Sequence, residues 1–383
     1  MTEIKTGTVI RGYKFLEKIG HGGYSDVYKV INERFDMYFV AKVLKFTPQF
    51  PLEEHQNGCS KNVTQSAEDL DPINIYSIYD QNQSNINGTT CESSQSANSL
   101  LSLQNHSREF DRAWKSFDAE VNALLKLDHP HIIRLYDHFR DTSNFYLILE
   151  YCPNGSLMDL IQKDKKVTGK RLFEISKQLL NALSYIHMMG ISHCDVKPQN
   201  VLFDEFGRVK LADFGIATFE MRVKNHKCSY AYAPPEVLKG ISEYDTLKSD
   251  VWSTGITLIY ASTGKMPFQC DTFEQLYSNV ESENITISSD MPHELLMIAK
   301  SMITYDPLHR ITMKEAENRL NEMATVTLPP LKGLERGHYS NMLLCEAKKS
   351  KSLYKTPFLT RRMILNSKPS VNKSSSLRMN VNL

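Results

Sequence analysis

Four polar residues that suit phosphoryl chemistry stand close together in the middle of the chain. Asp195, Lys197 and Asn200 fall within six residues, and Asp213 follows two short apolar runs joined by a turn, residues 201–211. A tight hairpin over these runs would bring Asn200 and Asp213 side by side. Two oxygen-bearing side chains at one point, with a carboxylate and an ammonium nearby, suit Mg²⁺ that holds a polyphosphate. Taken singly, each acid is better explained as a turn or cap residue.

A glycine-rich segment near the N-terminus is a second candidate for phosphate contact. It runs from Gly20 to Val27 and lies between two stretches with strand-like alternation, residues 13–20 and 25–30. Because glycine has no Cβ, such a hairpin lets backbone N–H groups approach a phosphate closely. Taken alone, this segment is more commonly explained as a glycine turn that merely joins two strands.

The central stretch resembles the protein-kinase family. His193-Cys194-Asp195 stands where that family has His-Arg-Asp, and Asp213-Phe214-Gly215 matches its Asp-Phe-Gly motif. One such tripeptide arises by chance, but several motifs in the family's order do not. The resemblance covers residues 13–321 apart from one insertion. It implies an α+β, bilobal fold: a small β-rich lobe with one main helix, a larger helical lobe, and ATP between them.

The resemblance also implies a set of nucleotide contacts. The glycine-rich segment aligns with the family pattern through Gly20, Gly22, Ser25 and Val27, with serine in place of the third glycine. Lys42 would bind the α- and β-phosphates, although without the family context a strand lysine that faces solvent is favoured. The other nucleotide contacts implied are Val40, Leu149, Glu150, Cys152, Leu202 and Asp213.

Four of these contacts have specific implied roles around the base. Val40 stands where the family usually has alanine, so its extra methyl groups narrow the adenine pocket. Leu149 would guard the back of that pocket. The backbones of Glu150 and Cys152 would hydrogen-bond the adenine edge.

The catalytic roles follow from the same alignment. Asp195 would accept the proton of the substrate hydroxyl, and Lys197 would neutralise the γ-phosphate during transfer. Glu120 would form an ion pair with Lys42 and orient it. Asn200 and Asp213 would hold the metal, Mg²⁺ with Mn²⁺ as a second choice. The sequence Asp-x-Lys-Pro-x-Asn from Asp195 resembles serine/threonine kinases rather than tyrosine kinases.

Cys194 departs from the family in an informative way. Members with arginine at this position place a cation beside the base, and a phosphate on the activation loop neutralises it. A thiol removes that phosphate receptor, and residues 219–228 carry no Ser, Thr or Tyr hydroxyl. The sequence therefore predicts activity that is independent of activation-loop phosphorylation. A redox role for Cys194 is the alternative, but most such thiols are inert packing groups.

Residues 229–236 resemble the family's substrate-docking segment. Ser229 would hydrogen-bond Asp195 and Lys197, and Glu236 would pair with Arg310 as a structural ion pair. Asp250 would hydrogen-bond the backbone of the catalytic loop.

Substrate preference can be approached from three other positions. Kinases that select arginine before the target use acids at sites matching Ser156, Gln199 and Ala261, none of which is acidic here. A strong preference for basic motifs is therefore not expected, although Asp159 offers partial compensation.

The elements that must position these residues can be located by periodicity. Strands are predicted at 13–20, 25–30, 37–44, 132–136 and 145–150, and a helix is predicted at 171–188. Apolar residues spaced by three or four from Phe110 to Leu125 predict another helix that carries Glu120.

Composition sets broad limits. The 383 residues are 41% apolar and 23% charged with a net charge of +1, so total charge predicts no binding to nucleic acid or to a membrane surface. Seven cysteines without motif spacing suggest reduced intracellular thiols, and neither a signal core nor a transmembrane run is seen. The chain is expected to be cytoplasmic, with a nuclear location left open.

Charge is uneven along the chain and marks two non-catalytic segments. Residues 46–112 carry nine Asp and Glu against three Lys and Arg, and their polar composition predicts a disordered insertion before the helix. After a short segment 1–12 and the kinase domain 13–321, a basic tail is predicted over 322–383. Residues 353–368 faintly resemble a calmodulin target, but Pro357 interrupts the helix start, so a charged irregular tail is favoured.

Three function classes remain to be compared. An active kinase would use ATP, a divalent metal and protein substrates that bear Ser or Thr. A silent pseudokinase scaffold has no chemical need for all of Lys42, Glu120, Asp195, Asn200 and Asp213, which are all present. A small-molecule kinase would not need the docking segment 229–236.

Overall fold

The fold was analysed in a computed structural model of the chain. It describes residues 3–22, 25–46, 94–223, 229–241, 243–268, 272–282 and 291–326. Most of the predicted insertion and of the basic tail, with the calmodulin-like residues 353–368, lies outside these described residues. Within them, no helix is long and apolar enough to cross a membrane.

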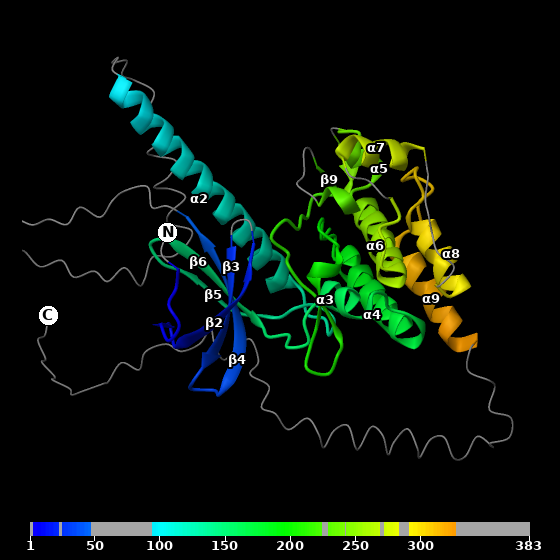
Figure 1. The fold of residues 1–383 in the computed structure, drawn as a ribbon, viewed down its shortest axis with the longest axis horizontal. Helices are drawn as coiled ribbons and strands as arrows, with labels where there is room; N and C mark the ends of the chain where they lie inside the picture. The colour runs from blue at the N-terminus through cyan, green and yellow to red at the C-terminus, as the bar shows by residue number, and fades with distance from the viewer. Residues whose placement is uncertain are drawn as a thin grey trace, which may run out of the picture. The chain divides into compact units, whose positions relative to one another are not determined.

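A six-stranded antiparallel sheet forms the first part of the fold, and Figure 1 shows its strands in blue and teal. Its strand order is β1-β2-β3-β4-β6-β5. The strands are β1 (Val9–Ile10), β2 (Tyr13–His21), β3 (Ser25–Asn32), β4 (Met37–Lys45), β5 (Leu135–Arg140) and β6 (Asn144–Glu150). Alternating residues of β2, β3 and β4 are buried, which is the pattern of a sheet whose two faces differ. The strand predicted at 132–136 is displaced, because β5 begins only at Leu135.

One long helix, α2 (Ser94–Lys126), accompanies the sheet and packs on β4, β5 and β6. It begins well inside the segment predicted to be irregular, so the prediction of disorder over 46–112 is wrong for residues 94–112. No glycine or proline interrupts this stretch, and a helix already nucleated by packing extends at one hydrogen bond per added residue. Polar composition alone therefore misplaced the boundary.

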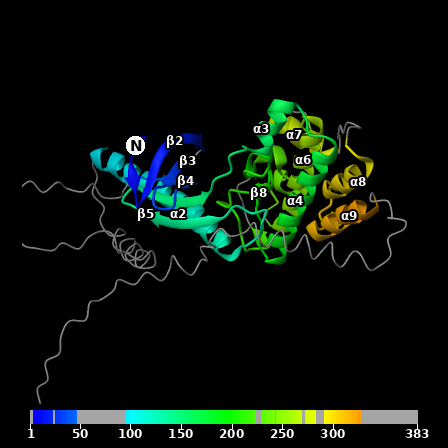
Figure 2. The same ribbon diagram turned by 90° about the horizontal axis from the view of Figure 1, so that it is seen from below.

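Helices form most of the second part of the described fold (Figures 1 and 2). They are α3 (Leu157–Asp164), α4 (Gly169–Met188), α5 (Pro235–Leu238), α6 (Thr246–Thr263), α7 (Phe273–Glu281), α8 (His293–Met302) and α9 (Met313–Val326). Helix α6 is buried nearly all round, and its buried residues include polar side chains such as Thr246 and Asp250. The described residues thus confirm the bilobal α+β fold. Helix α9 passes through the boundary predicted at 321.

The remaining short elements hold the chemistry-bearing loops. The predicted hairpin is present as β7 (Val201–Phe203) and β8 (Val209–Leu211), with Val201 opposite Leu211. Two 3-10 turns, η1 (Pro198–Asn200) and η2 (Tyr230–Tyr232), and the strand pair β9 (Arg222–Val223) and β10 (Tyr244–Asp245) complete the described elements.

Candidate active site

Lys42 lies between two carboxylates that come from distant parts of the chain. Its Nζ is 2.6 Å from Oε2 of Glu120 on α2 and 2.6 Å from Oδ1 of Asp213, which follows β8. The Glu120 side chain is fully buried and that of Lys42 is 12% exposed. The ion pair implied between Lys42 and Glu120 is therefore present, and the same lysine also reaches the Asp-Phe-Gly motif.

The electrostatics favour the charged forms of Lys42 and Asp213, whereas burial raises the pKa of Glu120. Burial alone would lower the pKa of Lys42, but the Asp213 and Glu120 carboxylates outweigh burial and raise it. The Lys42 ammonium in turn lowers the pKa of Asp213 to about 2. Lys42 is thus a permanent cation and Asp213 a permanent anion at neutral pH.

Strand register sets the face on which Lys42 projects. Lys42 is paired with Val27 on β3, and Val40 precedes it by two, so all three side chains lie on one face of the sheet. Phe39, Ala41 and their neighbours fill the core on the opposite face. Val27, Val40 and Lys42 are thus presented together, as the implied nucleotide contacts require.

The glycine-rich turn keeps its glycines for reasons of space. Gly20 is paired with Val27, and a Cβ on Gly20 would come within 3.3 Å of the Val27 Cβ. A Cβ on Gly22 would lie 3.1 Å from Oγ of Ser25. Both distances are shorter than ordinary van der Waals contacts, so these two positions have little room for a side chain larger than the hydrogen of glycine. Gly23 and Tyr24 lie outside the described residues.

Asp195 is held by three donors at the entrance to β7. Its Oδ1 accepts from Oγ of Ser229 at 2.8 Å, and its Oδ2 accepts from Nζ of Lys197 at 2.6 Å. Asn200 donates through Nδ2 to the carbonyl of Asp195 at 2.8 Å and to Oδ2 at 3.1 Å. Lys197 also donates to Oγ of Ser229 at 3.0 Å. The contacts expected of Ser229 are therefore present.

Asp250 of α6 fixes the backbone that leads into this cluster. Its two oxygens accept from the N–H groups of His193 at 2.7 Å and Cys194 at 2.8 Å, as expected from the sequence. Cys194 and Asp213 both have positive φ, at 66° and 65°. Such a backbone is strained for residues other than glycine, and it persists where surrounding bonds hold it.

The residues predicted to contact adenine lie at the junction after β6. Leu149 and Glu150 end that strand, Cys152 follows, and Leu202 lies on β7, where it bridges to Ser156. Burial raises the pKa of the Cys152 thiol to about 12, so it is a packing group rather than a nucleophile.

The sequence did not single out Lys210, which belongs to this junction. Its Nζ lies 2.8 Å from Oε1 of Glu150 and 2.9 Å from Oε2. The pair connects β8, next to the metal-binding candidate Asp213, to the end of β6. A charged residue between the apolar Val209 and Leu211 was the available signal, because a buried strand rarely holds an unpaired lysine.

Asn200 and Asp213 fit the chemistry of a hard cation. Asn200 donates through Nδ2 alone, which keeps its Oδ1 available among the described residues, and Asp213 uses Oδ1 for Lys42. No group of three His, Cys, Asp or Glu side chains in the described ranges could hold a metal. One amide oxygen and one carboxylate completed by phosphate oxygens is the donor set that Mg²⁺ accepts.

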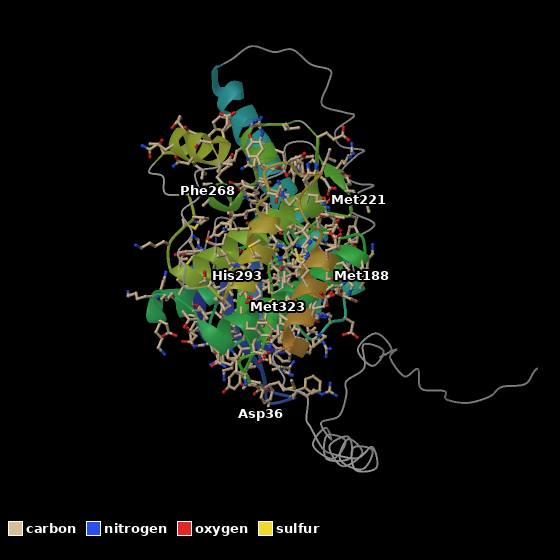
Figure 3. All side chains as sticks on the ribbon, turned by 90° about the vertical axis from the view of Figure 1, so that its right-hand side faces the viewer. Asp36, Met188, Met221, Phe268, His293 and Met323 are labelled. Atoms are coloured by element: carbon tan, nitrogen blue, oxygen red, sulfur yellow. The ribbon has the colours of Figure 1, made fainter. Side chains whose placement is uncertain are left out.

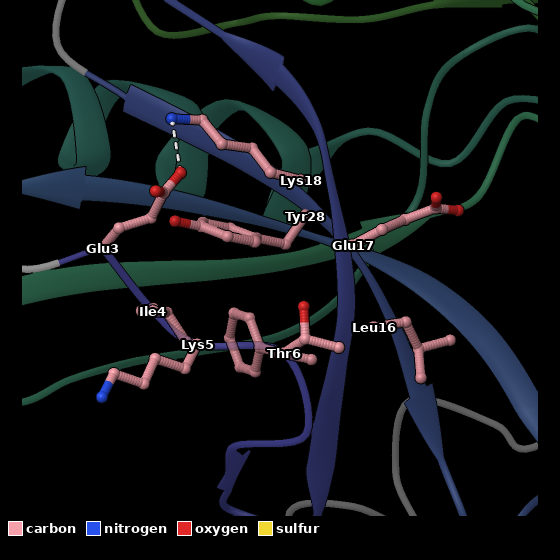
Figure 4. A pocket seen from close by; sticks show the side chains of 9 residues that line it. Glu3, Ile4, Lys5, Thr6, Leu16, Glu17, Lys18 and Tyr28 are labelled. Atoms are coloured by element: carbon pink, nitrogen blue, oxygen red, sulfur yellow. Dashed lines mark ion pairs between the residues drawn. The ribbon is translucent and has the colours of Figure 1, made fainter.

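A separate pocket of about 340 Å³ lies beneath the N-terminal segment (Figure 4). Residues 3–6 cover β2 and β3 there, and Lys18 forms an ion pair with Glu3 at 3.1 Å. None of the predicted site residues lines this pocket, so it is not the active site.

The scaffold ion pair expected in the helical part is also present. Arg310 is fully buried, and its two terminal nitrogens donate to Glu236 at 2.8 and 3.0 Å. This bidentate pair ties the end of the docking segment to the turn before α9.

Comparison with known proteins agrees with this geometry. The model of the protein kinase domain matches residues 99–320, which begins after the strands that carry the glycine-rich turn and Lys42. Maternal embryonic leucine zipper kinase of Danio rerio is 33% identical over 204 residues, 51% of this chain and 29% of that protein. Cell cycle serine/threonine-protein kinase CDC5/MSD2 of Saccharomyces cerevisiae is 30% identical over 211 residues, 54% of this chain and 30% of that protein.

The chain thus spans less than a third of the length of these relatives. The family match nevertheless covers more than half of the chain and includes Glu120, Asp195, Asn200 and Asp213. Lys42, outside the match, is joined to the same site by its two carboxylate contacts. The chain belongs to the protein kinase domain family.

Proposed function

We propose that this chain is an active, ATP- and Mg²⁺-dependent protein serine/threonine kinase that phosphorylates Ser and Thr hydroxyls of protein substrates. The observation that carries the proposal is the contact of Lys42 with both Glu120 and Asp213 at 2.6 Å. A lysine so placed is aligned for the phosphates, and one carboxylate beside it can face a metal. The 30% identity to CDC5/MSD2 of Saccharomyces cerevisiae, a protein named as a serine/threonine-protein kinase, supports the choice of Ser/Thr over Tyr.

Asp195 is the proposed acceptor of the hydroxyl proton. As the substrate oxygen forms its bond to the γ-phosphorus, the bond from that phosphorus to the leaving oxygen breaks and the hydroxyl proton passes to the Asp195 carboxylate. Lys197 and Ser229 fix the direction of that carboxylate through contacts of 2.6 and 2.8 Å. Lys197 also offers a positive charge to the transferring group.

A bound Mg²⁺ ion would supply positive charge that neutralises the phosphate oxygens. Asn200 and Asp213 are the residues proposed to hold it, with Mn²⁺ as a possible substitute. Asp213 would contribute a carboxylate that already contacts Lys42, and Asn200 would contribute the amide oxygen of the side chain that donates to Asp195.

We further propose that activity does not require a phosphate on the activation segment, residues 213–236. Cys194 supplies no cation to receive such a phosphate. The Cys194 N–H is instead fixed by Asp250 at 2.8 Å, so the catalytic loop is positioned by an internal carboxylate.

The proposed substrates lack a dominant basic motif. Ser156, Gln199 and Ala261 are not acidic, and the structure also bears on Asp159, the residue offered as partial compensation. Oδ2 of Asp159 accepts from the N–H and the Oγ of Ser156, each at 2.7 Å, in the capping box of α3. This use reduces what Asp159 can offer to a substrate arginine. A peptide array dominated by arginine two and three residues before the phosphosite would contradict this.

Placement in the calmodulin-dependent-kinase-like branch is part of the proposal and rests on the motif resemblance alone.

The competing function is a scaffold that binds nucleotide without transfer. Loss of one of the five polar site residues would favour it, but all five are present and Lys42, Glu120 and Asp213 are in contact.

The test is transfer of labelled γ-phosphate from ATP to dephosphorylated casein, before and after phosphatase treatment of the purified full chain. We expect transfer that survives the treatment and is lost in Asp195→Asn. Nucleotide binding without transfer by the wild-type chain would establish the scaffold instead. Transfer that disappears with phosphatase and returns with a loop phosphate would refute only the claim of independence.

A further inference from the structure

A buried hydroxyl holds the first half of the activation segment. Thr246 is the first residue of α6 and is fully buried. Its Oγ1 donates to the carbonyl of Glu220 at 3.0 Å and lies 3.3 Å from that of Met221, while its N–H donates to the Met221 carbonyl at 3.0 Å. Oγ1 also accepts from Oγ of Ser192 at 2.7 Å. Three separate stretches of chain therefore meet at one side chain.

The third stretch, around Ser192, leads directly into the catalytic loop. Ser192 and Thr218 exchange two backbone hydrogen bonds, of 2.9 and 3.0 Å. The hydroxyl of Thr246 thus closes a connection between the start of α6, the residues before His193 and the activation segment just after Thr218.

Two neighbouring contacts also hold the activation segment, one to β10 and one to the end of α2. Strand β9 pairs with β10, with Arg222 opposite Asp245, the residue before Thr246. On the other side, Nζ of Lys126 at the end of α2 lies 3.9 Å from the ring centroid of Phe219. Met221 uses its backbone here, because its side chain is 58% exposed and is seen at the edge of the molecule in Figure 3.

Helix capping does not explain the Thr246 hydroxyl. Asp245 is the N-cap of α6, and its carboxylate accepts from the N–H groups of Leu247 and Lys248 at 2.9 and 3.1 Å. The Thr246 hydroxyl is therefore not needed to cap the helix, and its hydrogen bonds are made to Ser192 and to the activation segment.

Helix α6 consequently holds two parts of the site. Asp250, one turn after Thr246, holds the backbone of His193 and Cys194. Thr246 holds the activation segment that leads toward Ser229 and the substrate. One anchor is the Thr246 hydroxyl and the other is the Asp250 carboxylate, and neither needs a phosphate.

We propose that Thr246 is a positioning residue: with Ser192, it keeps the activation segment in its substrate-binding conformation in place of a phosphate. The proposal rests on the proposed kinase function and explains how the segment is ordered when Cys194 offers no cation. It predicts that the hydroxyl matters for the use of the protein substrate and not for the binding of ATP.

The test compares Thr246→Val, which keeps the shape and removes the hydroxyl, with Thr246→Ser, which keeps the hydroxyl. Thr257→Val is the matched control, because Thr257 is a buried threonine of α6 whose hydroxyl has no partner among the described residues. The assay uses the phosphatase-treated full chain and a peptide substrate that bears Ser. In it, Thr246→Val should lower kcat/KM for the peptide by about tenfold, as expected for lost buried hydrogen bonds. KM for ATP should not change. Thr246→Ser and Thr257→Val should stay within about threefold of wild type.

A second readout does not depend on catalysis. Hydrogen exchange at the amides of residues 217–222 should accelerate in Thr246→Val and not in Thr257→Val. If the wild-type chain transfers no phosphate, the proposed function fails, and this exchange still decides the role of Thr246. Unchanged exchange and unchanged peptide kinetics in Thr246→Val would overturn the inference. So would equal losses in Thr246→Val and Thr246→Ser, or a parallel loss of ATP and peptide affinity.

Discussion

At the scale of single residues, the position of Lys42 depends on a small number of carboxylate partners. Lys42 has two carboxylate partners, and only Glu120 is fully buried with it. A buried cation that loses one of two anions is left partly uncompensated, which is costly in a medium of low polarity. The alignment of Lys42 should therefore be more sensitive to Glu120 than to surface charges of the same helix.

The variant Glu120→Gln tests this directly. It keeps the size of the side chain and removes its charge, so Lys42 should move toward Asp213 and away from its position for phosphate. We expect kcat/KM for ATP to fall about 10- to 100-fold, which corresponds to about 1.4–2.8 kcal/mol of transition-state stabilisation.

Asp118→Asn provides the control, because it removes a negative charge from an exposed position of the same helix. Steady-state kinetics with ATP as the varied substrate measure both variants. Equal activities of Glu120→Gln and wild type would show that Asp213 alone aligns Lys42.

Ser229 offers a second test at this scale. Its hydroxyl links Asp195 and Lys197 with bonds of 2.8 and 3.0 Å. Hydrogen bonds to charged groups contribute about 1.5–3 kcal/mol, so Ser229→Ala should reduce kcat by about 10- to 100-fold. Ser229→Thr keeps the hydroxyl and should retain most activity. If alanine and threonine variants are equally active in peptide turnover, the hydroxyl has no part in orienting Asp195.

The predictability of these residues follows from their distance along the chain. Asp195, Lys197 and Asn200 directly precede one short hairpin and Asp213 directly follows it, so spacing and turn chemistry already indicate that they meet. Lys42 and Glu120 are 78 residues apart with an insertion between them, and nothing local links them. Their pairing was available only through the family resemblance.

At the scale of elements, helix α2 must be held so that Glu120 reaches Lys42. An aromatic cluster does this near the middle of the helix. Phe117 stacks on Phe145 of β6 with centroids 4.9 Å apart, and Trp114 lies 5.6 Å from the same ring. Phe46 and Phe110 complete the cluster around Phe145 at 4.7 and 5.7 Å. These contacts fix the helix about one to three turns before Glu120.

Trp114→Ala should therefore impair catalysis from a distance. Removing a large core aromatic costs about 3–5 kcal/mol at full burial, and the partly buried Trp114 should cost up to about 3 kcal/mol. The loosened helix should let Glu120 leave Lys42, so kcat/KM for ATP should fall by more than the loss of folded protein explains.

Lys115→Ala is the matched control, since Lys115 is the adjacent, exposed residue of α2. Thermal unfolding and kinetics at a temperature where both variants are folded separate the two effects. A destabilised but fully active Trp114→Ala would show that α2 holds its position without the aromatic cluster.

The same helix shows where reading the sequence by elements fails. The apolar spacing from Phe110 to Leu125 located the half of α2 that packs on the sheet. Residues 94–112 have too few apolar groups to signal a helix by periodicity, and their continuity with the packed half decided the outcome. The shift of β5 to Leu135–Arg140 has a related cause: residues 132 and 133 are buried in the core, so their apolar character reflects packing rather than a ladder.

At the scale of the whole molecule, the parts of the described fold are joined by polar contacts that titrate. His129, just after α2, lies 2.9 Å from Oδ1 of Asn181 on α4, which donates to Glu317 of α9. His131 lies beside it, with ring centroids 5.6 Å apart, and contacts the carbonyl of Val209. The pair thus connects the end of α2 to α4, β8 and α9.

Both histidines are held in the neutral form. Burial lowers the pKa of His129 against the opposing effects of Asn181, Glu317 and Asp128, with Lys210 acting in the same direction as burial. Burial also lowers the pKa of His131, helped by His129, Lys210 and Arg208. In the unfolded chain both histidines would have a pKa of about 6.5.

The sign of the pH dependence follows from this difference. A group whose pKa is lower in the folded state binds fewer protons there, so its contribution to stability is complete above about pH 6.5. That contribution is lost as the pH falls from about 6.5 toward the folded-state pKa values.

We therefore expect Tm to decrease between pH 7 and pH 5, and we expect the double variant His129→Gln/His131→Gln to show a flatter dependence of Tm on pH. His309→Gln is the control, because the His309 side chain is 80% exposed. Thermal unfolding across this range gives the answer: if the double variant and wild type lose Tm in parallel while His309→Gln flattens the curve, the acid sensitivity arises at the surface and not at the junction of α2 with the helical lobe.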